Sequence, residues 1–171
     1  MKGLEICGTP NRENVDILSA LYASLASGYL NQGKIRECDE LLASWHGIFD
    51  GLKSKQSEEY STYLKTKSGV ESAKGNMGQA FNDSREAYRI IRGMYPAEDA
   101  RALDAEQAMF RCSYSSHSST WPEDFRQLLQ HSSGLRVSNP RSYVYVLVAG
   151  ANAYREAGRY GEALQLIDES I

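Results

Sequence analysis

The C-terminal stretch, residues 139–171, constrains the fold of this chain most, because its pattern predicts two helices joined by a tight turn. Asn139 can cap the first helix and Pro140 can begin it, since the proline ring fixes a helical φ and the missing N–H would be unpaired there. Gly158 is expected to end that helix. Apolar residues then return at helical spacing, namely Tyr160, Ala163, Leu164 and Ile167. The stretch therefore predicts an antiparallel helix pair, which is the unit of a repeat.

One part of this stretch allows a second interpretation. The run Val144–Val148 consists of residues that favour β-strands and could form a buried strand. The apolar pattern continues through Ala149, Ala151 and Tyr154, however, and that length exceeds the usual strand of about 5–6 residues. The pattern favours a helix, and the strand remains the alternative.

Similar patterns fill the rest of the chain. They predict helix pairs at about 14–51, 58–94, 98–134 and 140–171, within one domain that covers residues 1–171. The predicted turn glycines are each followed five residues later by a small residue; the three combinations are Gly33 with Cys38, Gly75 with Ala80 and Gly158 with Ala163. A small side chain there would let the returning helix cross closely over its partner.

The third pair departs from this rule. Phe125 is its nearest equivalent of the small residues, and the resulting offsets of 42, 45 and 38 residues still lie in the range of repeat proteins. The serine-rich segment from Ser113 to Thr120 predicts an expanded turn in this pair. Thr120 and Glu123 have the spacing of a capping box, which supports a new helix at that point.

A family resemblance follows from these residues. Residues 151–164 (ANAYREAGRYGEAL) are similar to the tetratricopeptide repeat (TPR), and residues 26–38 are a weaker copy. The period exceeds the usual ~34 residues and resembles the longer helix pairs of bacterial signal-responsive transcription activators. The resemblance implies an all-α, right-handed superhelix (α-solenoid) of about four antiparallel helix pairs that binds a protein or peptide ligand. We therefore expect a fragment of a larger bacterial regulator, serving in sensing or oligomerisation. The alternative is a switch domain that responds to a small molecule or signal peptide.

Composition excludes several other classes. The net charge of -3 and the pI near 5.7 give no reason to expect direct nucleic-acid binding. No apolar run is long enough for a signal peptide or a membrane span. Cys7, Cys38 and Cys112 are far apart, which is typical of buried thiols in a reducing compartment. The predicted location is the cytoplasm.

The sequence also lacks a catalytic motif. Residues 28–34 (GYLNQGK) have the spacing of a phosphate-binding loop, but Ile35 replaces the Ser or Thr that would hold magnesium. His46, His117 and His131 are not paired at metal-ligand spacing. No cysteine has an identifiable base beside it. We predict no enzyme activity, no metal and no cofactor.

What remains is a binding surface. In a solenoid of helix pairs the first helices line the concave side, and the predicted groove residues are Asn31, Lys65, Tyr145, Asn152 and Arg155. Their amide and charged groups could hold a peptide backbone or a carboxylate, although a solvated polar face remains the alternative. The resemblance supports Asn152, which lies at the family's peptide-clamping Asn, whereas Val148 stands where the clamp has Lys.

The end of the chain gives one more expectation. Four apolar residues of the last helix have no predicted covering helix, namely Leu164, Leu166, Ile167 and Ile171. The ends of solenoids normally need a polar cap. The sequence therefore predicts self-association through the C-terminal helix pair.

Overall fold

The computed structural model describes residue 11 and residues 14–52 and 55–170, and these residues are helical apart from their turns. The all-α prediction is confirmed, and the strand alternative for Val144–Val148 is wrong, because this segment lies inside a continuous helix. Contacts divide the chain into two compact units, one ending at Met94 and the other beginning at Tyr95. A single domain over residues 1–171 stays a prediction. No helix in the described ranges is long and apolar enough to cross a membrane.

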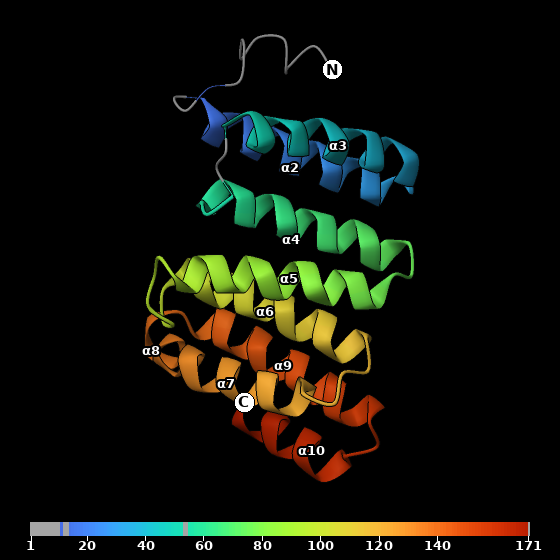
Figure 1. The fold of residues 1–171 in the computed structure, drawn as a ribbon. Coiled ribbons are helices and arrows are strands. Elements are labelled where there is room, and N and C mark those ends of the chain that lie inside the picture. Colours follow the sequence, from blue (N-terminus) through green and yellow to red (C-terminus); the bar gives the residue numbers. More distant parts are fainter. Residues whose placement is uncertain (1–10, 12–13, 53–54, 171) are drawn as a thin grey trace. The chain divides into compact units, whose positions relative to one another are not determined.

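The first unit consists of two antiparallel helix pairs (Figure 1). They are α2 (Val15–Asn31) with α3 (Ile35–Leu52), and α4 (Glu58–Ala73) with α5 (Met77–Arg92). The core is organised around Trp45 on α3, whose side chain is fully buried. Its ring stacks on Tyr22 at 5.5 Å and meets Tyr63 edge-on at 5.4 Å, while its indole N–H donates to Ser19 at 3.3 Å. Three helices are thus joined through one side chain.

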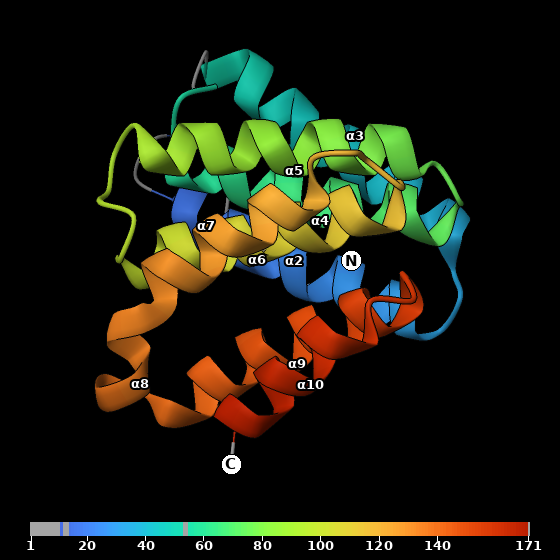
Figure 2. The ribbon, with the colours of Figure 1, turned by 90° about the horizontal axis from the view of Figure 1, so that it is seen from below.

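The second unit also contains two pairs but has an inserted segment between them. Its helices are α6 (Ala100–Ser115), α7 (Trp121–His131), α8 (Leu135–Ser138), α9 (Pro140–Glu156) and α10 (Tyr160–Glu169), with a 3-10 turn at Ser132–Gly134. Figure 2 shows α8 between α7 and α9, and α10 running back along α9. The predicted start of α9 is confirmed, since Asn139 accepts the N–H of Ser142 at 3.2 Å and Pro140 is the first helical residue.

The turns within the pairs share one geometry. Gly33, Gly75 and Gly158 have positive φ values of 69°, 83° and 75°, a region that favours glycine. Each glycine N–H donates to the carbonyl three residues earlier, and the next N–H donates to the carbonyl five residues earlier. This arrangement satisfies the last carbonyls of the first helix. The predicted turn glycines are therefore confirmed.

The third pair uses the same turn without glycine. His117 has φ 53°, its N–H donates to Tyr114 at 2.9 Å, and the N–H of Ser118 donates to Ser113 at 3.0 Å. The four turn residues Gly33, Gly75, His117 and Gly158 are therefore separated by 42, 42 and 41 residues. The predicted offsets of 42, 45 and 38 were wrong in the third pair, because the alignment there used Phe125 in place of the turn residue.

The serine-rich turn is also shorter than predicted. Helix α6 continues through Ser115, and the buried Ser113 donates to a carboxylate oxygen of Asp124. The hydroxyl of Thr120 donates to the same carboxylate oxygen at 3.0 Å and makes no cap to the helix it precedes. The new helix is confirmed, but its predicted capping box is wrong, since Asp124 takes the hydroxyl that would have capped it.

Phe125 is large because its neighbour has no side chain. Cys38, Ala80 and Ala163 are buried, as close helix crossing requires. The Phe125 ring is 2% exposed and lies against Gly150 of α9, where an added Cβ would meet ring atom Cζ at 2.0 Å. The third pair therefore keeps a close crossing by placing the missing side chain on the facing helix.

Candidate functional site

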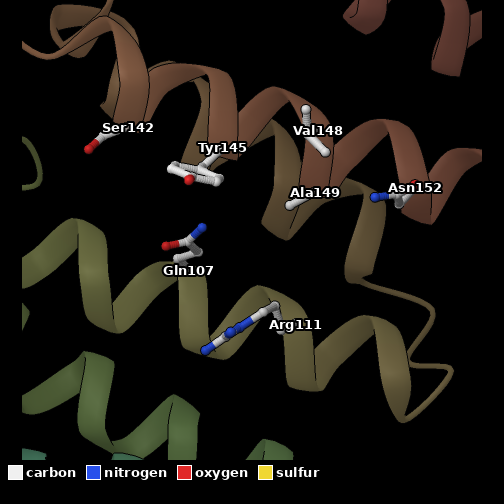
Figure 3. A pocket seen from close by; sticks show the side chains of 7 residues that line it. All are labelled: Gln107, Arg111, Ser142, Tyr145, Val148, Ala149 and Asn152. Atoms are coloured by element: carbon white, nitrogen blue, oxygen red, sulfur yellow. The ribbon is translucent and has the colours of Figure 1, made fainter.

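A groove lies between α6 and α9 in the second unit. One part has a volume of about 380 Å³ and is lined by Gln107, Arg111, Ser142, Tyr145, Val148, Ala149 and Asn152 (Figure 3). A second part, about 220 Å³ in volume, shares Gln107 and Ser142 with the first. Its walls are Ala100, Leu103, Asp104, Leu128, Leu135, Asn139 and Val146. Because the two parts share residues, we treat them as one α6–α9 groove with a more apolar end and a more polar end.

The repeat places the polar end. Gln107 and Arg111 lie ten and six residues before the turn residue His117, and Val148 and Asn152 lie ten and six residues before Gly158. Residues four apart lie on the same side of a helix. Equivalent positions of two successive first helices therefore line opposite walls of the groove, and Figure 3 shows the two sets facing each other.

The polar end combines exposed apolar surface with polar groups that the fold does not use. Tyr145 is 56% exposed and Val148 is 43% exposed. The Arg111 guanidinium forms no hydrogen bond or ion pair with another described residue, and the same holds for the side-chain amides of Gln107 and Asn152. Figure 3 shows the Gln107 side chain pointing toward Tyr145. These groups can bond to a ligand without breaking a contact of the folded chain.

The predicted groove residues are only partly brought together. Tyr145 and Asn152 line the α6–α9 groove. Arg155 does not line it; this exposed residue lies 3.8 Å from the carboxylate of Glu156. Asn31, at the exposed end of α2, and Lys65, half-buried on α4, belong to the first unit. Their predicted role in binding stays a prediction.

Gln107 and Arg111 were not predicted from the sequence. The third pair has no turn glycine, so its first helix could not be aligned with the others. The signal that could have found these residues is the spacing of about 42 residues. Counting 41 residues back from Asn152 leads to Arg111, and 41 back from Val148 leads to Gln107.

The remaining titratable groups support structure. Glu106 is fully buried, and both of its carboxylate oxygens lie 2.9 Å from Nδ1 of His131. It lies eleven residues before its turn residue, where the other pairs have Tyr22, Leu64 and Leu147. The Glu106–His131 pair thus joins α6 to α7 inside the core, away from any ligand.

The described cysteines and acids offer little reactive chemistry. Cys38 and Cys112 are buried free thiols, while Cys7 lies outside the described residues. Burial, with smaller effects of Asp39 and Glu37, raises the pKa of the Cys38 thiol, which makes it a poor nucleophile. No group of three His, Cys, Asp or Glu side chains that could hold a metal occurs in the described part of the chain.

Several solved structures share this arrangement of helix pairs. BtubC from P. vanneervenii aligns with a TM-score of 0.81 and 16% identity over 99% of this chain and 68% of that chain. A candidate kinesin light chain from Podosopora anserina with nearly identical TPR-like repeats aligns with a TM-score of 0.78 and 18% identity over 88% of this chain and 72% of that chain. A variant of that protein with one substituted residue reaches 0.81 at 18% identity, over 94% of this chain and 76% of that chain.

The fold is a TPR-like helical repeat. No protein-family model and no curated protein sequence matches the chain. At these identities the structural likeness establishes the fold alone, and it confirms the predicted TPR-like α-solenoid class. The TPR-like fold also explains the groove, because successive first helices in such a repeat present equivalent residues to the same side.

Proposed function

We propose that this TPR-like chain binds an extended peptide segment of a partner protein in the α6–α9 groove. The observation that carries the proposal is Arg111, whose guanidinium is not used by the fold and lies in one groove with Tyr145 and Asn152. An arginine fork suits a carboxylate, which it can hold by two parallel hydrogen bonds. We therefore expect the peptide to carry an acidic side chain or its C-terminal carboxylate at this point.

The dimensions of the groove suit a short stretch of extended chain. From Leu103 to Arg111 the α6 wall covers eight residues, which corresponds to about 12 Å of helix. An extended peptide advances about 3.3 Å per residue, so about four residues cover this length. An apolar side chain would enter the end near Leu103 and Val146. The amides of Gln107 and Asn152 would bond the peptide backbone between the two ends.

The open, mixed character of the groove favours a peptide over a metabolite. A small-molecule switch would be expected to enclose its ligand in a mainly apolar cavity. Here the two depressions join along the surface and place Arg111, Gln107 and Asn152 beside exposed apolar side chains. A role in a bacterial transcription regulator, a switch that responds to a small molecule or signal peptide, self-association and a cytoplasmic location stay predictions from the sequence.

The test uses a random peptide library displayed on phage and selected on the full chain. A selected peptide is then measured by fluorescence anisotropy. We expect acidic residues among the selected peptides and a loss of affinity of about tenfold to a hundredfold in Arg111→Ala, because a hydrogen bond to a charged group contributes about 1.5–3 kcal/mol. Asn152→Ala should weaken binding less.

Two matched variants make the result specific. Arg136→Ala removes an exposed arginine of α8 outside the groove, and Arg155→Ala removes the predicted residue that does not line it. Both should bind the peptide as the unchanged chain does. The proposal is refuted if Arg111→Ala and Asn152→Ala bind with unchanged affinity, or if Arg136→Ala loses as much affinity as Arg111→Ala.

A further inference from the structure

Helix α10 exposes three apolar side chains on one face. Tyr160 is 65% exposed, Leu164 is 60% exposed and Ile167 is 44% exposed. They are the first, fifth and eighth residues of the helix, and this spacing places them on one side. We call these three residues the α10 stripe. The core of the second unit is contacted by another face of α10, through Ala163 and Leu166.

The same three positions are covered in helix α7. Its first, fifth and eighth residues are Trp121, Phe125 and Leu128, and the latter two are 2% and 0% exposed. Their cover is α9, the first helix of the next pair. Tyr154 meets the rings of Trp121 at 5.0 Å and Phe125 at 5.7 Å. An antiparallel helix therefore covers this face of α7.

The first unit shows the same relation with different chemistry. Asp39, the fifth residue of α3, accepts a hydrogen bond at 3.1 Å from Lys74, which caps α4. Trp45 of α3 also meets Tyr63 of α4 edge-on. The face that corresponds to the α10 stripe thus contacts the first helix of the following pair in both units. On α10 this face is open to solvent in the described part of the chain.

We propose that the α10 stripe docks a helix of a partner protein, lying antiparallel to α10. The contact between α7 and α9 defines the chemistry of that helix. On α9 the facing residues are Leu147, Gly150 and Tyr154, spaced by three and four positions. The partner helix should therefore carry an apolar residue, a small residue three positions later opposite Leu164, and an aromatic residue four positions after that opposite Tyr160.

Charge supports the antiparallel orientation. Asp168 is exposed near the C-terminal end of α10 and makes no hydrogen bond or ion pair with another described residue. An antiparallel partner would place its N-terminal end beside Asp168, where the positive end of the helix dipole and a Lys or Arg are favourable. A second copy of α10 fits less well, because it would bring Leu164 against large side chains in place of a small residue.

The first experiment appends a copy of residues 140–157 to the end of the full chain through a short Gly-Ser linker. The linker raises the effective concentration of the helix, so that a weak contact can be measured. We expect hydrogen exchange of the α10 amides to slow at least tenfold. The matched control is the same appended segment with Leu in place of the glycine that copies Gly150, and it should give little protection. Equal protection by the two segments refutes the proposal.

The second experiment concerns the chain alone. Sedimentation velocity over a range of concentrations should show a monomer. If it shows a dimer that Leu164→Ser with Ile167→Ser dissolves, while Tyr145→Ser with Val148→Ser in the groove does not, the occupant is a second copy and the partner-helix proposal is wrong. Circular dichroism checks that the variants keep their helix content. The groove variants do not touch the α10 stripe, so failure of this proposal and failure of peptide binding are distinguishable.

Discussion

The Gly150→Ala substitution gives the sharpest test of the packing in the second unit. The added Cβ would lie 2.0 Å, 2.3 Å and 2.6 Å from three carbon atoms of the Phe125 ring. The ring cannot move freely, because it also packs against Phe110 at 5.2 Å and Tyr154 at 5.7 Å. One methyl group should therefore push apart α7 and α9.

Two opposing effects set the size of the change. Replacing glycine by alanine inside a helix is normally favourable by about 1 kcal/mol. Overpacking of a core costs about 1–3 kcal/mol, and the depth of this overlap places Gly150→Ala at the upper end. We expect a net loss of about 2 kcal/mol in the free energy of unfolding. Adding Phe125→Leu to Gly150→Ala should recover part of it, because a smaller side chain leaves room for the methyl group.

The assay is urea denaturation followed by circular dichroism. Gly47→Ala is the matched control, because Gly47 lies inside α3 and an added Cβ there meets nothing within 4 Å. This variant should gain up to about 1 kcal/mol. The two alanine substitutions should thus change stability in opposite directions. A Gly150→Ala variant as stable as the unchanged chain would contradict the described contact between Gly150 and Phe125.

Two further predictions concern buried polar groups. Burial, with hydrogen bonds to Glu156 and Glu169, raises the pKa of Tyr114 and Tyr143 from 10.0 to about 12. Their contribution to stability should be complete below pH 10 and disappear as the pH rises from 10 toward 12, which an absorbance titration of phenolate in folded and unfolded chain will check; ionisation near pH 10 in the folded chain would contradict it. Glu106→Ala should cost about 3 kcal/mol, because it leaves a cavity and removes the partner of His131. Replacing both Glu106 and His131 by Leu should come within about 1 kcal/mol of the unchanged chain in urea, and equal stability of Glu106→Ala would count against this account.

Local chemistry made much of the fold predictable. Glycine can adopt positive φ without strain, so Gly33, Gly75 and Gly158 announced three turns directly. Asn139 and Pro140 announced the start of α9 for equally local reasons. The helix pairs followed from these signals and from apolar spacing. Tyr145 and Asn152 of the candidate groove followed from the same helix pattern.

What could not be predicted depends on contacts between segments distant in the sequence. His117 takes the turn position of a glycine, and no local rule identifies it. Phe125 looked like an exception until its neighbour Gly150 was known, 25 residues away. Without the third turn, α6 could not be aligned, so Arg111 was missed. Thr120 had the spacing of a capping residue but bonds Asp124 instead.

The position six residues before each turn residue has a wider consequence. Four different side chains occupy it, those of Ser27, Gly69, Arg111 and Asn152, on helices whose turns are alike. None of the four belongs to the buried hydrophobic core. Natural variation or a laboratory library at this site could thus retune which sequence is recognised, rung by rung, while the scaffold that presents it is inherited unchanged.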